Sequence, residues 1–226
     1  MSAVVDDTST ALVALAAECE NDEAGAALHV MVVAVDDGAA AHADDRALLD
    51  DVDRKSPRAG TIAGRRAARA TLAQLGRNDV VRRGPIGEPL WPQGISGSIA
   101  HDDDVAVCVI DARGRPIGID VEPALPLPAE VVADVVRDDE RAMVRGADGQ
   151  VDLLRARALF CAKEAAYKAC APLDGVFLSF HDVRVTADGD GWRDDVVVWR
   201  LVTSTGRTLR ARVCVAPRVM AICTIA

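Results

Sequence analysis

The chain has 226 residues, of which half are apolar and 3% aromatic, and its formal net charge is −9. These values exclude a disordered chain and a general nucleic-acid-binding protein, which needs a basic surface. No apolar run approaches the roughly 20 residues of a membrane-spanning helix, and the acidic N-terminus lacks the basic region of a signal peptide. Six cysteines without C-x-x-C spacing are typical of buried thiols in a reducing compartment, so we expect a cytoplasmic protein.

The first 53 residues give two predicted elements. ALVALAAECE predicts a short helix, and residues 27–35, ALHVMVVAV, predict a buried strand. The acidic stretch 36–53 follows without a predicted element.

Residues 54–83 are strongly basic, with nine Lys and Arg against a single acid. Within them, TIAGRRAARATLAQLG predicts a helix that ends at Gly76. Arg65 and Arg69 lie four apart on this helix and share a face. That face is either opposite a polyanion or a solvated basic surface.

The Gly- and Pro-rich stretch 83–101 predicts a loop. In its last residues, GSIAH, Ser98, His101 and backbone N–H groups form a candidate phosphate site; the alternative is a structural histidine. The elements predicted after it are strands at 105–111 and 116–123, helices at 128–145 and 152–171, and an antiparallel meander over the remaining residues.

The strand segment GIDVE places Asp120 and Glu122 two residues apart, so their carboxylates point to one face. Pro123 cannot continue an interior ladder, so the pair lies near a strand end. Two like charges side by side repel each other unless a cation lies between them. The alternative is a solvated strand edge.

The segment LFCAKEAAYKA carries a third acid, Glu164, on a helical stripe with Phe160 and Tyr167. An acid on an apolar stripe is costly to bury without a cation. Pairing with Lys168, four residues on, is one explanation. Together with Asp120 and Glu122, however, Glu164 completes a hard-oxygen set suited to Mg²⁺.

The order AGRRAARATLAQLG, GEPLWPQGISGSIAH, IGIDVEP and LFCAKEAAYKA resembles the Sfp-type 4′-phosphopantetheinyl transferases, in particular the enterobactin synthase component D branch. The resemblance covers about half of the chain. It implies an α+β fold of two similar α/β halves, residues 1–114 and 115–226, with the boundary near 112–116. The halves would form an intramolecular pseudo-dimer with the active site in the cleft between them.

The resemblance also implies the reaction: transfer of phosphopantetheine from coenzyme A to a serine of an acyl or peptidyl carrier protein. Mg²⁺ is the implied ion, with Mn²⁺ as a substitute, and a monomer is expected, without nucleic-acid or membrane partners. The metal ligands would be Asp120, Glu122 and Glu164, and the catalytic residues Glu164 and Lys168. The residues that would bind coenzyme A are Arg58, Arg65, Arg69, Ser98, His101, Lys163 and Lys168.

The chain departs from the family pattern at Gly60 and Thr61, where relatives often carry a Glu-Phe pair, and at two further places. Many relatives carry a lysine where this chain has Ile86, for which Arg82 or Arg83 is a candidate replacement. The acidic run 102–104 directly follows His101, which lowers the expected affinity for coenzyme A. Two alternatives stay open: a relative that binds coenzyme A or a carrier protein without transfer, and an unrelated Mg²⁺-dependent phosphohydrolase.

Overall fold

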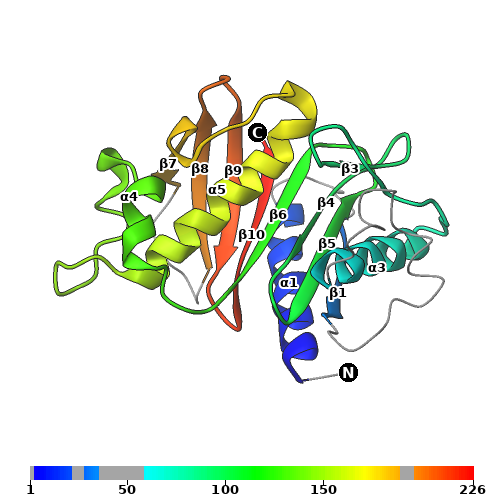
Figure 1. Cartoon of the computed structure of the whole chain (residues 1–226), viewed down its shortest axis with the longest axis horizontal. Coiled ribbons are helices and arrows are strands. Elements are labelled where there is room, and N and C mark those ends of the chain that lie inside the picture. Colours follow the sequence, from blue (N-terminus) through cyan, green and yellow to red (C-terminus); the bar gives the residue numbers. More distant parts are fainter. Residues whose placement is uncertain (1–2, 22–27, 36–58, 189–195) are drawn as a thin grey trace.

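The computed structural model describes residues 3–21, 28–35, 59–188 and 196–226. They form a mixed α/β arrangement with two larger antiparallel sheets lying side by side, each covered by one long helix (Figure 1). Across these ranges, every helix is too short or too polar to span a bilayer.

The first sheet has the strand order β1-β5-β4, with β1 at Leu28–Ala34, β5 at Val105–Asp111 and β4 at Ser96–His101. The predicted strands at 27–35 and 105–111 are thus confirmed over the described residues. Helix α3, Ala59–Gln74, packs on this sheet and confirms the predicted basic helix. Gly64 allows the helix to approach the sheet closely, since a Cβ at this position would lie only 2.8 Å from the Ile99 side chain.

The prediction of a loop over 83–101 is wrong in part. A short hairpin, β2 at Arg82–Arg83 with β3 at Pro89–Leu90, begins the stretch, and β4 ends it. Gly97 is a strand residue: a Cβ there would lie 2.7 Å from the Trp91 ring, so the glycine permits close packing rather than a turn. The backbone of GSIAH is therefore paired with β5 and does not form a phosphate-binding loop.

The second sheet has the order β6-β10-β9-β8-β7, which confirms the predicted strand at 116–123 and the antiparallel meander. Its strands are β6 at Ile117–Pro123, β7 at Val183–Ala187, β8 at Val196–Thr203, β9 at Thr208–Cys214 and β10 at Arg218–Ile225.

Helix α5, Leu153–Asp174, crosses the second sheet and confirms the second predicted helix. The Asp152 side chain accepts hydrogen bonds from two backbone N–H groups of the first turn, and Gly175 ends the helix at a φ of 65°. A Cβ at Gly118 of β6 would lie 1.9 Å from the Ala165 carbonyl oxygen. The strand that carries Asp120 and the helix that carries Glu164 are thus in direct backbone contact.

Helix α1, Ala3–Asn21, is longer than the predicted ALVALAAECE helix. It packs on β1 of the first sheet and on β9 and β10 of the second. Its buried Leu12 and Leu15 share one hydrophobic cluster with residues of both sheets, such as Val107 and Ile222. The two sheets are therefore joined by a common core.

The predicted helix at 128–145 is wrong. The segment forms three short pieces: η2 at Ala129–Val131, α4 at Val132–Val135 and η3 at Asp138–Glu140. Val136 has extended backbone angles, which ends α4. Its apolar residues pack against α5 instead of forming one continuous stripe. A further short helix, η4 at Phe180–Asp182, follows α5.

Candidate functional site

Asp120 and Lys168 join β6 to α5. Lys168 Nζ donates to Asp120 Oδ1 at 2.6 Å, and the Asp120 residue is only 5% exposed. Burial lowers the pKa of Lys168, but the charge and hydrogen bond of Asp120 and the charge of Glu164 together outweigh burial, so the pKa is raised overall. The second oxygen, Asp120 Oδ2, is buried and has no hydrogen-bond partner among the described residues. A buried carboxylate oxygen without a partner is costly, which favours a cation or donor at this position.

Glu122 lies two residues further along β6, and its Oε2 accepts from Arg157 Nη1 at 2.5 Å. Arg157 also donates to the carbonyl oxygens of Leu125 and Pro126, so the segment after β6 is fastened to α5. Burial and the neighbouring charge of Asp120 raise the pKa of Glu122, although Arg157 partly opposes this.

Glu164 lies on α5 one turn before Lys168. Its pKa is raised by burial, then by the charge of Asp120, with a smaller contribution from Glu122. The three predicted acids therefore interact electrostatically although they are distant in the chain. The alternative in which Glu164 is bonded to Lys168 at the surface is not what the structure shows, since Lys168 bonds to Asp120.

The three acids fit a divalent ion in their chemistry, because all supply hard oxygen donors and one oxygen lacks a partner. They are not arranged as a closed metal site: within the described ranges, no three His, Cys, Asp or Glu side chains stand close enough to hold an ion. Asp120 and Glu122 are instead bonded to Lys168 and Arg157. Ion binding would require these two cations to share or release their carboxylates.

His101 lies at the end of β4, with its ring against Gly60 of α3, where a Cβ would be only 2.4 Å from Nδ1. Burial and the nearby Lys168 charge lower the pKa of His101, while Asp102 and Asp120 partly offset them. The ring is thus within electrostatic range of the acid site. A pocket of about 210 Å³ lies here and is lined by His101, Arg65, Arg83 and residues of α3 and β4.

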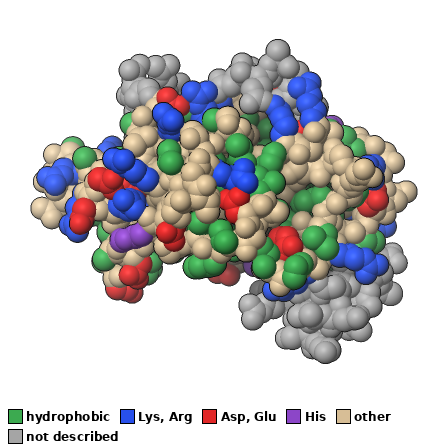
Figure 2. Space-filling view, turned by 90° about the horizontal axis from the view of Figure 1, so that it is seen from above, with side chains coloured by type: hydrophobic (Ala, Val, Ile, Leu, Met, Phe, Trp, Pro, Cys, Tyr) green, Lys and Arg blue, Asp and Glu red, His purple; other side chains and the backbone are tan. Residues whose placement is uncertain are grey.

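A second pocket of about 210 Å³ lies between β4, with the hairpin before it, and helix α5. Ser98 of β4 lines one side, with Ile86 beside it, and Tyr167 and Lys168 of α5 line the other. It shares Gly87, Pro89 and Ile99 with the pocket at His101, so the two adjoin. Seen from above, hydrophobic, basic and acidic side chains are interspersed along the middle of the molecular surface (Figure 2).

A third pocket, of about 560 Å³, adjoins the second through Tyr167. Glu164 and Tyr167 form its α5 side, α4 contributes Asp134, and Phe177 and other residues up to His181 form the opposite side. Tyr167 and Phe177 are in edge contact, with ring centroids 5.6 Å apart. The three pockets together lead from the basic helix, past Lys168, to an apolar recess beside Glu164.

Lys163 does not fit the phosphate contact predicted for it. The residue is 1% exposed, and its Nζ donates to Glu140 Oε2 at 2.6 Å and to the carbonyl oxygens of Val135 and Phe180. Glu140 is fully buried as well. The short helices around 129–140 and 180–182 cover this side of α5. Lys163 therefore forms a buried structural ion pair with Glu140 and does not face the pockets.

The other predicted phosphate contacts divide clearly. Arg65 is 9% exposed and lines the pocket at His101, as expected. Arg69, four residues on, is exposed and lines none of the three adjoining pockets. Arg58 lies outside the described residues. Of the two arginines predicted to share a face, only Arg65 thus lies at the pocket.

Two residues at the site were not singled out in the sequence. Arg157 lies seven residues before Glu164, which is two helical turns, so helical spacing was a usable signal. Arg218 bonds to Asp102 and Asp104, and no pattern in the sequence pairs it with residues more than a hundred positions away.

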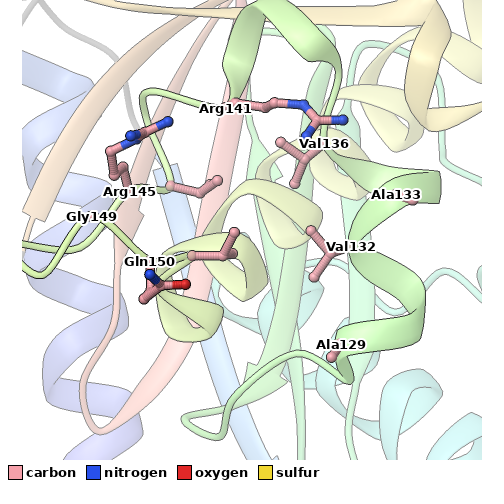
Figure 3. Close-up of a pocket in the computed structure, with 10 residues that line it drawn as sticks. Ala129, Val132, Ala133, Val136, Arg141, Arg145, Gly149 and Gln150 are labelled. Atoms are coloured by element: carbon pink, nitrogen blue, oxygen red, sulfur yellow. The ribbon is translucent and has the colours of Figure 1, made fainter.

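A separate pocket of about 270 Å³ lies between α4 and the segment that follows η3. In this view, Val132 and Val136 line one side, Arg145 and Gln150 stand on the other, and the Arg141 side chain extends toward Val136 (Figure 3). None of the predicted site residues lines it, and no carboxylate does either. It therefore has no part in the candidate site.

Comparisons with known proteins agree with the motif order. Residues 54–111 match the family model of the 4′-phosphopantetheinyl transferase N-terminal domain, and residues 116–194 match that of the 4′-phosphopantetheinyl transferase superfamily. Together, the two matched stretches take in more than half of the chain.

Three curated relatives illustrate the similarity. The 4′-phosphopantetheinyl transferase Npt of Nocardia iowensis is 37% identical over 64% of this chain and 64% of its own length. PptT of Mycobacterium tuberculosis is 39% identical over 58% of this chain and 60% of its own. Enterobactin synthase component D of Salmonella typhi is 33% identical over 65% of this chain and 63% of its own length. The chain thus spans less than two thirds of the length of these relatives.

Proposed function

Because the chain belongs to the 4′-phosphopantetheinyl transferase superfamily, we propose that it transfers the 4′-phosphopantetheine group of coenzyme A to a serine of an acyl or peptidyl carrier protein. The observation that carries this proposal is the buried Asp120 Oδ2, which has no hydrogen-bond partner among the described residues, on the carboxylate bonded to Lys168. Lys168 and Glu164 line two adjoining pockets that share Tyr167. The other product would be adenosine 3′,5′-bisphosphate.

The proposed binding mode follows the three pockets. Arg65 would hold phosphate groups of coenzyme A, Ser98 and His101 would hold its 3′-phosphate, and Arg83 would supply the charge that Ile86 lacks. The pantetheine chain would run past Tyr167 into the apolar recess lined by Phe177. In this assignment, residues 1–114 and 115–226 act as the two halves of a pseudo-dimer, and the ligand lies between them. The pocket that has Ser98 on one side and Lys168 on the other supports this division.

Lys168 would stabilise negative charge on the phosphoryl oxygens during transfer, as a positioned cation does in phosphoryl transfer generally. The serine Oγ attacks the β-phosphorus, and the bond from that phosphorus to the bridging oxygen breaks. Glu164 would accept the serine proton directly or through water, and the rise in its pKa, caused by burial and the charge of Asp120, favours proton uptake.

Asp120, Glu122 and Glu164 would hold the magnesium ion, which when bound neutralises and orients a pyrophosphate. Arg157 keeps Glu122 at the strand end until then. Lys168 keeps Asp120 in place in the same way. The two cations thus offset the repulsion between Asp120 and Glu122, which lie on one face of β6.

The partner would be an acidic carrier protein, of fatty-acid, polyketide, non-ribosomal peptide or siderophore synthesis. This chain is itself acidic, so docking would use its basic segment around residues 54–83. We propose a monomer, since one chain would supply both halves of the site. All six cysteines are buried thiols outside disulfides, which supports the proposed cytoplasmic location.

The test is to incubate the protein with coenzyme A, Mg²⁺ and an apo carrier protein and to measure the intact mass of the carrier. A gain equal to phosphopantetheine, lost on adding a chelator and regained with Mg²⁺, is the expected result. Binding of coenzyme A without a mass gain would instead indicate a non-catalytic relative. Phosphate release without a mass gain would indicate a phosphohydrolase.

A further inference from the structure

The acidic turn after His101 is bonded to an arginine from the other sheet. Arg218 Nη1 donates to Asp102 Oδ2 at 2.7 Å, and its Nη2 donates to Asp104 Oδ2. The Arg218 side chain is 11% exposed, the Asp102 side chain 4% and the Asp104 side chain 63%. One guanidinium thus bridges two carboxylates, one buried and one at the surface.

Asp102 is held in this geometry by its own turn. Its Oδ1 accepts from the backbone N–H groups of Asp104 and Val105, at 2.8 and 2.9 Å. This leaves Oδ2 to face Arg218. The turn between β4 and β5 is therefore built to present a carboxylate to the second sheet.

Arg218 begins β10, where it pairs in register with Pro123, directly after Glu122 of β6. The bridge consequently connects the strand end that carries the acid site to the strand end that carries His101. Asp102 also acts electrostatically on His101. A change in charge on this turn would change the electrostatic potential in the pocket that His101 lines.

We propose that Arg218 is a positioning residue for coenzyme A: it fastens the turn after His101 to the second sheet and cancels negative charge beside the 3′-phosphate. This rests on the proposed function, in which His101 contacts that phosphate. Without Arg218, the carboxylates of Asp102 and Asp104 would stand next to a phosphate site without a neutralising cation. Their negative charge would oppose binding of the negatively charged phosphate.

The test compares two ligands that differ only in the 3′-phosphate, coenzyme A and dephospho-coenzyme A. Their Kd values are measured by calorimetry with intact Arg218→Gln protein and Mg²⁺. The Kd for coenzyme A should rise about three- to five-fold, as expected for loss of a partly exposed ion pair, while that for dephospho-coenzyme A stays unchanged. The triple variant Arg218→Gln, Asp102→Asn, Asp104→Asn should regain the wild-type ratio.

Arg207→Gln is the matched control, because Arg207 forms a similar ion pair with Asp174. It should leave both Kd values unchanged. Equal weakening of both ligands by Arg218→Gln would mean a general structural role and would overturn the proposal, and so would no change in either.

Should Arg218→Gln fail to fold, Asp104→Asn replaces it, since that side chain is mostly exposed. Removing this charge should tighten coenzyme A binding about two- to three-fold and leave dephospho-coenzyme A unaffected; an unchanged ratio overturns the proposal. A wild-type protein that neither binds coenzyme A nor modifies a carrier would overturn the proposed function as well. A fully active wild type with no selective effect of these variants overturns this inference alone.

Discussion

Lys168 Nζ lies 2.6 Å from Asp120 Oδ1, so the lysine occupies one oxygen of a carboxylate whose other oxygen has no partner among the described residues. The pair ties helix α5 to strand β6 at the centre of the candidate site. It also sets up a competition, because a divalent ion at Asp120 would have to share this carboxylate with the lysine.

Replacing Lys168 by Met should therefore destabilise the metal-free protein and increase the stabilisation that Mg²⁺ provides. The pKa of Lys168 is raised in the folded state, so its contribution to stability is fully present at pH 7 and is lost only as pH rises through that pKa. We expect the melting temperature to fall by a few degrees without metal, and Mg²⁺ to restore more of it than in the wild type. Transfer should fall about 100-fold or more.

Thermal unfolding with and without Mg²⁺ measures this response. Arg141→Met is the control, because its ion pair with Asp138 is largely exposed and remote from the acids. Identical Mg²⁺ responses in wild type and Lys168→Met would show that the lysine and the ion do not compete for Asp120.

Glu164→Gln should abolish transfer and yet stabilise the metal-free protein. The pKa of Glu164 is raised by burial and by Asp120, so the charged form costs stability at pH 7. The wild type is relieved of this cost as pH falls, because the group becomes protonated. The variant's advantage in melting temperature should consequently be largest near neutral pH and vanish below the ordinary pKa of glutamate, about 4.3.

Melting curves from pH 4 to 8 in the presence of a chelator, together with the carrier mass assay, check both halves of this expectation. Near wild-type transfer by Glu164→Gln would remove Glu164 from the proposed mechanism. A stability difference that does not change with pH would contradict the electrostatic explanation.

Local patterns predicted the parts of the fold that depend on local chemistry. Alternation predicted the meander, and the apolar strands at β5 and β6 followed from short β-rich runs. The loop prediction for GSIAH is wrong because glycine and proline usually indicate loops, whereas Gly97 is a strand residue packed against Trp91. The helix prediction for 128–145 is wrong because the valines of this segment pack on α5 from separate short pieces.

At the site, spacing predicts that Asp120 and Glu122 share a face and that Glu164 lies on one stripe of α5 with Phe160 and Tyr167. Spacing could not distinguish Lys163 from Lys168. Both flank Glu164, but only the fold reveals that one side of α5 is covered by α4, η3 and η4, and the other faces β6 and the pockets. Long-range pairs such as Arg218 with Asp102 depend on the same information.

Lys163→Met should be severely destabilising, because it leaves Glu140 charged and fully buried without its cation. Breaking a buried pair from one side typically costs about 3–5 kcal/mol. Burial lowers the pKa of Lys163 and Glu140 opposes this, so the charged pair depends on both partners being present. Urea unfolding should show a large fall in the free energy of unfolding.

The double variant Lys163→Met, Glu140→Gln should recover part of this loss, because Gln can still accept the backbone N–H of Val185. Lys168→Met serves as the comparison, since it removes a lysine from the same helix that is partly exposed. A cost for Lys163→Met no greater than for Lys168→Met would contradict the buried ion pair.

Arg65 and Arg69 form a natural matched pair on helix α3. Arg65 is nearly buried and lines the pocket at His101, whereas Arg69 is exposed and lines none of the three adjoining pockets. Arg65→Ala should raise the KM for coenzyme A about ten-fold or more, because a charge-assisted contact to phosphate is typically worth about 1.5–3 kcal/mol. Arg69→Ala should change it by less than about two-fold. Steady-state kinetics with a saturating carrier protein measure both, and equal effects of the two variants would remove Arg65 from the proposed coenzyme A site.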